Sequence, residues 1–182
     1  MIKLIFVTGI LMIFIPVTGQ DFSNKGKDFW VAYGNHVRMF ETITANNQAE
    51  KMELYMTSDI NTTGTVQIPG INFSTNFSVT ANQITTIAIP RSAGLFDEST
   101  YNLGIHITAE KPIIVYSFIY VNAVSGATLC LPVLTLGREY YSVNFTQVSN
   151  VNNSYSYFDV IATDTGVTTV EIIPAQNTKG GH

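Results

Sequence analysis

The chain has 182 residues, of which 46% are hydrophobic, 12% aromatic and only 12% charged, with a formal net charge of −4 and one cysteine. This composition excludes a disordered chain, and the acidic balance argues against a nucleic-acid-binding protein, which would carry a basic surface. A single cysteine excludes an internal disulfide framework and a cysteine-based zinc site.

The amino terminus predicts a secretory signal peptide. Lys3 supplies a positive charge, residues 4–17 form an apolar run, and Val17 and Gly19 are the small residues that precede a cleavage site. The apolar run is too short for a transmembrane helix, which needs about 20 residues. We therefore expect residues 1–19 to be a signal peptide cleaved near Gly19, a secreted or cell-surface location, and no transmembrane segment.

The rest of the chain alternates apolar and polar residues with a period of two, which is typical of half-buried strands. The pattern is clear at 52–57 and 73–79, and residues 113–121 are apolar on both faces, which predicts a central strand covered on both sides. Further strands are expected at 85–89, 104–108 and 168–173, where β-branched residues are frequent.

Turn residues separate these runs at 59–64 and 69–70, and residues 110–112 predict a turn before the central strand, with Pro112 at its start. The longest break, 91–103, has room for a helical turn at most. Short strands at this spacing predict an all-β fold, an antiparallel two-layer β-sandwich.

The chain also predicts tandem β units. Residues 26–30 (Gly-Lys-Asp-Phe-Trp) are echoed by residues 137–141 (Gly-Arg-Glu-Tyr-Tyr), each with glycine, base, acid and two aromatic residues. We expect a first β-sandwich unit at 20–136 and an incomplete second unit at 137–182, so that the chain is the front of a longer protein. If the chain is complete, residues 137–182 must instead finish the sheets of the first unit.

Four segments in order resemble the amino-terminal domain of IgGFc-binding proteins, a family that includes mucosal mucin-associated proteins and bacterial secreted proteins. The segments are 28–33 (Asp-Phe-Trp-Val-Ala-Tyr), 54–59 (Leu-Tyr-Met-Thr-Ser-Asp), 110–116 (Glu-Lys-Pro-Ile-Ile-Val-Tyr) and 137–141. The resemblance implies a secreted β-rich module at the front of a large multidomain protein, acting in binding or adhesion, and it supplies no catalytic residues. The low cysteine content is similar to that of the bacterial members, which argues against immunoglobulin Fc as the ligand.

No catalytic or metal-binding pattern is present in the sequence. Asp59 and Asp164 stand at turns, where an aspartate normally bonds its own backbone, and Cys130 lies in an apolar run, as a small buried hydrophobic residue would. The three histidines lack the spacing of a metal site; they are His36, His106 and His182. We expect no catalytic residues, no cofactor, no metal and no enzymatic activity.

Aromatic residues are the remaining candidates for a site. Phe29 and Trp30, with their counterparts Tyr140 and Tyr141, either contact a ligand or pack in the core or between the units. We favour packing, because the same pair recurs at the same place in both units.

The leading hypothesis is a non-enzymatic, secreted or cell-surface adhesion module that binds an extracellular protein or glycan and no nucleic acid. The alternative is a carbohydrate-binding module or a carbohydrate-active enzyme domain, with exposed aromatic residues as its platform. A purely structural spacer, which would bind nothing, is the third possibility.

Overall fold

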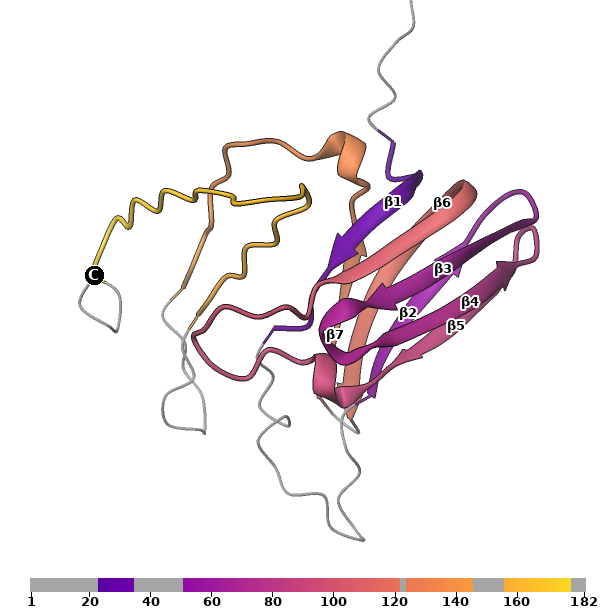
Figure 1. Cartoon of the computed structure of the whole chain (residues 1–182), viewed down its shortest axis with the longest axis horizontal. Coiled ribbons are helices and arrows are strands. Elements are labelled where there is room, and N and C mark those ends of the chain that lie inside the picture. Colours follow the sequence, from indigo (N-terminus) through magenta and orange to yellow (C-terminus); the bar gives the residue numbers. More distant parts are fainter. Residues whose placement is uncertain (1–22, 35–50, 122–123, 146–155, 178–182) are drawn as a thin grey trace, which may run out of the picture.

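The computed structural model describes residues 23–34, 51–121, 124–145 and 156–177, in which the regular elements are strands and single-turn 3-10 helices (Figure 1). Every pair of neighbouring strands is antiparallel, which confirms the all-β antiparallel prediction. The predicted signal peptide lies outside the described residues. The elements are β1 (Gly26–Val31), β2 (Lys51–Thr57), β3 (Thr62–Ile68), η2 (Pro69–Ile71), β4 (Phe73–Val79), β5 (Ile84–Ile89), η3 (Arg91–Ala93), β6 (Ile105–Val121), β7 (Val124–Cys130) and η4 (Val133–Thr135).

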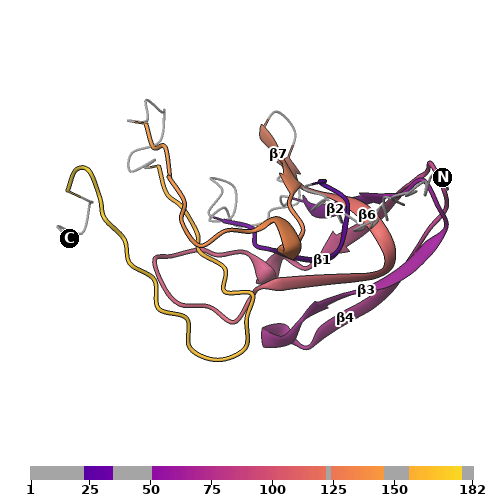
Figure 2. The ribbon, with the colours of Figure 1, turned by 90° about the horizontal axis from the view of Figure 1, so that it is seen from above.

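The strands form two sheets that share β6. The first sheet has the order β4-β3-β6-β1 and uses the first half of β6, and the second has the order β5-β2-β6-β7 and uses the second half. Figure 2 shows β6 running along the layer of β3 and β4 and then curving back into the layer of β2. The shared strand therefore ties the two layers into one body.

The corner of β6 lies at residues 110–112. On β1, Asp28 pairs with Thr108 but Gly26 pairs with Ile113, so the register shifts by several residues at this point. Sheets commonly make such corners with a bent strand that passes from one to the other, and a proline without an N–H is tolerated where the ladder is interrupted. The prediction of a turn that separates two strands here was wrong, because β6 continues through Pro112.

One hydrophobic core lies between the two sheets and is formed by inward-facing side chains of all the strands. Alternation along each strand places every second residue in this core, which is why the polar and apolar residues of the sequence alternate. Cys130 is part of it, as predicted, and burial raises the pKa of its thiol. The most deeply buried large side chains are Phe29, Leu54, Met56, Val66, Ile68, Ile105, Ile107, Ile113 and Val115.

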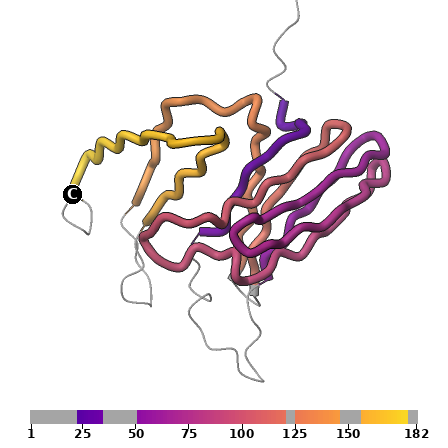
Figure 3. The backbone as a smooth tube through the Cα atoms, in the orientation of Figure 1, coloured from indigo at the N-terminus to yellow at the C-terminus, as the bar shows by residue number. Residues whose placement is uncertain are grey.

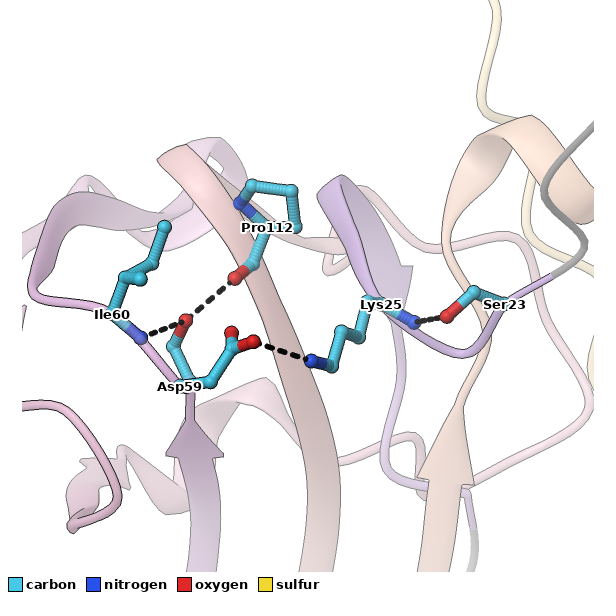
Figure 4. Close-up of polar contacts among 6 residues, drawn as sticks. Ser23, Lys25, Asp59, Ile60 and Pro112 are labelled. Atoms are coloured by element: carbon cyan, nitrogen blue, oxygen red, sulfur yellow. Dashed lines mark hydrogen bonds and ion pairs between the residues drawn. The ribbon is translucent and has the colours of Figure 1, made fainter. Parts of the chain in front are cut away.

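The predicted turn at 69–70 lies in η2, between β3 and β4, whereas the turn predicted at 59–64 is shorter, because β3 begins at Thr62 and only residues 59–61 lie outside the strands. Asn72 and Asn82 have positive φ angles of 52° and 60°, a conformation that asparagine tolerates better than most residues. In the turn between β2 and β3, Asp59 forms an ion pair of 3.1 Å with Lys25, which lowers the pKa of the Asp59 carboxyl group (Figure 4). Asp59 thus joins the turn to the residue just before β1.

The described part of 137–177 contains no strand, so the prediction of a strand at 168–173 was wrong. Val167 and Ile173 are 99% and 85% exposed, and Figure 3 shows this part of the chain extended beside the sandwich. A β-forming sequence gains its stability from ladder partners and burial rather than from the backbone alone. Residues 168–173 have the alternating sequence, but they have neither a partner strand nor a buried side.

Candidate binding surface

Four aromatic side chains lie together on the outer surface of the second sheet. Tyr55 comes from β2, and Tyr116, Phe118 and Tyr120 are alternate residues of β6, each on the side opposite the buried Val115. The register places Tyr55 directly opposite Tyr116. We call these four residues the aromatic face.

Three rings of the aromatic face, those of Tyr55, Phe118 and Tyr120, contact one another across and along the strands. Tyr55 and Phe118 have ring centroids 5.5 Å apart with planes tilted by 34°, and Phe118 and Tyr120 are 5.0 Å apart with a tilt of 57°. These distances and tilts lie in the range that aromatic pairs prefer. Tyr116 is 40% exposed, and its partner on β7, Leu129, is 38% exposed. The rings are thus held in place while part of their surface remains open to solvent.

Two charged residues of β2 border the rings. The hydroxyl group of Tyr55 donates a hydrogen bond of 2.8 Å to the carboxylate of Glu53, which raises the pKa of Tyr55 to about 12, because a phenolate would lose this bond and meet a negative charge. The ammonium group of Lys51 lies 5.5 Å from the ring centroid of Tyr120. Both charges are therefore engaged with tyrosines of the aromatic face.

The aromatic face corrects one prediction from the sequence. Residues 113–121 were expected to form a central strand covered on both sides; the strand is indeed paired with β2 and β7, but its outer side is open at Tyr116. The signal that could have found this surface is the chemistry of the outer positions. They carry tyrosine and phenylalanine at every second residue, whereas Ile113 and Val115 on the inner side are aliphatic.

The residues predicted as aromatic contacts lie in different surroundings. Phe29 is fully buried in the core, whereas Trp30 points to the outer side of the first sheet and stacks on His106. Tyr140 and Tyr141 are 69% and 98% exposed, and the hydroxyl group of Tyr140 bonds the backbone of Gly137 at 2.8 Å. Phe29 therefore serves packing, and none of the four belongs to the aromatic face.

A second group of side chains lies on the outer side of the first sheet. His106, which alternates with two buried isoleucines as the sequence suggested, has its Nε2 atom 2.8 Å from the carboxylate of Asp28 and its ring against Trp30. The residues described by the structure contain no cluster of three metal-ligating side chains and no helix long and apolar enough to cross a membrane.

The described residues thus form an antiparallel β-sandwich whose second sheet carries a partly exposed aromatic face. Residues 126–182, a range that begins within β7, match the family described as IgGFc binding protein. No curated protein and no solved structure was found to match the chain.

The match confirms the resemblance to IgGFc-binding proteins for residues 126–182. Of the four segments that carried the resemblance, 137–141 lies inside the matched region, and 28–33, 54–59 and 110–116 lie before it.

Proposed function

We propose that this chain is a non-enzymatic binding module used in adhesion, and that the aromatic face is its binding surface. The observation that carries the proposal is the group of partly exposed aromatic rings on the outer side of the second sheet. The match of residues 126–182 to a family described by its binding of another protein supports the binding role, although the aromatic face itself lies before the matched range.

The fold suits the aromatic face to binding because the rings are fixed before any ligand arrives. The second half of β6 is paired on both sides, with β2 and with β7, and Tyr55 is anchored by its hydrogen bond to Glu53. Tyrosine and phenylalanine offer large contact areas and lose little conformational freedom on binding. A rigid platform of this kind limits the entropic cost of association.

We also propose that the module is exported and stands at the front of a larger protein, with a signal peptide at 1–19 and β units at 20–136 and 137–182. Support for a second unit comes from Tyr141, Val143 and Phe145, which alternate as in a strand and are 98%, 74% and 73% exposed. Apolar groups in such a pattern are normally covered by further structure. Export is tested by fusing residues 1–25 to a phosphatase that is active only outside the cytoplasm.

The binding function is tested with immobilised probes of known identity: IgG Fc, collagen, fibronectin and polysaccharides of defined composition. Saturable binding to at least one probe, lost in a Tyr116→Ala/Phe118→Ala double variant, is the expected result. The matched control is Ser74→Ala/Asn76→Ala, which removes two exposed polar side chains from the outer side of the first sheet. Binding to none of the probes, or binding that both double variants retain, would overturn the proposal.

A further inference from the structure

We infer that the aromatic face binds a neutral saccharide chain. This inference rests on the proposed function, because it names the ligand class of the same surface. It is carried by the composition of the outer side of the second sheet, where aromatic rings, hydroxyl groups and small residues lie side by side.

The rings provide the stacking surface that a sugar needs. The face of an aromatic ring is electron-rich and attracts the weakly positive C–H groups on one side of a pyranose ring. Phe118 lies between Glu53 on β2 and Ala127 on β7, and Glu53 lies opposite Ala88 on β5. Ala127 is a small neighbour on one side of Phe118 and Ala88 ends the row beyond Glu53, so a flat ligand can approach the ring from the β7 side.

The charges on this side favour a neutral ligand. Among the described outward-facing residues that pair within the second sheet, only Lys51 and Glu53 are charged, and their charges are opposite. Glu53 accepts the hydrogen bond of the Tyr55 hydroxyl group, and Lys51 lies over the ring of Tyr120. The surface therefore offers no net charge to attract an anionic or a cationic partner.

Hydroxyl groups around the rings suit a ligand that both donates and accepts hydrogen bonds. Three of the four aromatic residues are tyrosines, Thr86 lies opposite Tyr55 on β5, and Ser125 lies opposite Tyr120 on β7. A hydroxyl group can donate and accept, as the hydroxyl groups of a sugar do; that of Tyr55 donates to Glu53 and offers a ligand only its acceptor oxygen. The large aliphatic residues of this side, Ile84, Ile114 and Leu129, lie on three different strands, and Ile84 and Ile114 pair with Thr57 at the end of β2 rather than with the rings. The chemistry thus favours a saccharide over a protein ligand.

The experiment is a glycan array probed with the purified chain, followed by calorimetric titration of the best glycan. We expect saturable binding to neutral glycans, weakened about tenfold or more by Phe118→Ala and by Tyr116→Ala, since each removes one stacking ring. Phe118→Tyr keeps a ring and should retain binding, as should Asn76→Ala on the other sheet. Thermal unfolding of each variant separates loss of binding from loss of folding.

The outcomes distinguish this inference from the proposed function. If the array shows no binding while a protein probe binds through Tyr116 and Phe118, the saccharide inference falls and the binding function stands. Preference for charged glycans, or glycan binding unaffected by Phe118→Ala, also overturns the inference. If neither glycans nor protein probes bind, both proposals fall.

Discussion

Trp30 and His106 stack face to face across β1 and β6, with ring centroids 4.3 Å apart and planes only 9° from parallel. The imidazole ring is also held by Asp28, whose carboxylate lies 2.8 Å from the Nε2 atom of His106. Gly104 makes room for the indole ring, since a Cβ atom at this position would lie 3.2 Å from it. The position of Trp30 is therefore set by the residues of β6 and the segment before it.

Replacing His106 with alanine should release Trp30 from this stack. Because Trp30 is the only tryptophan of the chain, its fluorescence reports on this site alone. We expect a red shift of the emission maximum and a loss of about 0.5–1.5 kcal/mol in the free energy of unfolding, the usual value of an aromatic pair. Gln67→Ala, at the position paired with His106 on β3, should leave the emission unchanged. An unaltered spectrum in His106→Ala would show that the stack does not hold the indole ring.

The corner of β6 depends on a buried hydroxyl group. Ser58 is 4% exposed and donates a hydrogen bond of 2.8 Å to the carbonyl oxygen of Pro112, and its hydroxyl oxygen accepts one of 3.4 Å from the amide of Ile60. Ser58→Ala should lower the free energy of unfolding by about 1–3 kcal/mol, because the partly buried carbonyl group of Pro112 loses its partner. Urea denaturation measures this loss, with the exposed Ser78→Ala on β4 as the control. Equal midpoints for the two variants would contradict the role of Ser58.

The strands were predictable from the sequence where one side of the strand is exposed to solvent and the other is buried. In β2 and β4 the alternation of apolar and polar residues gave both the strand and its inner side, and the turns between them were marked by glycine, proline and asparagine. The corner of β6 was not predictable, because Glu110, Lys111 and Pro112 have the local composition of a turn. What keeps the strand continuous is its pairing with four other strands, which the local sequence does not encode.

The candidate binding surface was missed for a related reason. A run that is apolar on both sides, such as 113–121, normally indicates burial on both sides. Whether its outer side is covered depends on which elements fold over it, and that is decided by tertiary structure. At 168–173 a strand was predicted from β-branched residues alone. No strand forms there, because a strand also needs a neighbouring strand to pair with.

Gly64 is required by the close approach of β3 to its neighbours. A Cβ atom at this position would overlap the carbonyl oxygen of Thr108 and the ring of Phe77. The backbone oxygen cannot rotate away, so Gly64→Ala should cost about 1–3 kcal/mol, as overpacking in a core does. Gly126→Ala is the matched control, because its nearest neighbour, Ile119, lies at an ordinary contact distance of 3.6 Å. Thermal unfolding of the two variants checks the prediction, which fails if their melting temperatures agree.

Tyr33 should make the protein sensitive to alkaline pH. Its side chain is 4% exposed and its hydroxyl group donates a hydrogen bond of 2.7 Å to the backbone carbonyl of Glu53. Burial raises the pKa of Tyr33 well above its usual value near 10. In the unfolded chain this tyrosine ionises near pH 10, whereas in the folded protein it stays neutral.

The stabilising contribution of Tyr33 is therefore fully present below about pH 10 and is lost as the pH rises toward the folded-state pKa, by at most about 1.4 kcal/mol per pH unit. Tyr55, whose pKa is raised to about 12 by its hydrogen bond to Glu53, adds a smaller effect because it lies at the surface. Tyr33→Phe removes one ionisable group, so its free energy of unfolding should fall less steeply than that of the wild type between pH 10 and about 11.5. Urea denaturation at a series of pH values measures both slopes. Parallel slopes for wild type and Tyr33→Phe would show that Tyr33 ionises equally in the folded and unfolded states and would refute its burial in the core.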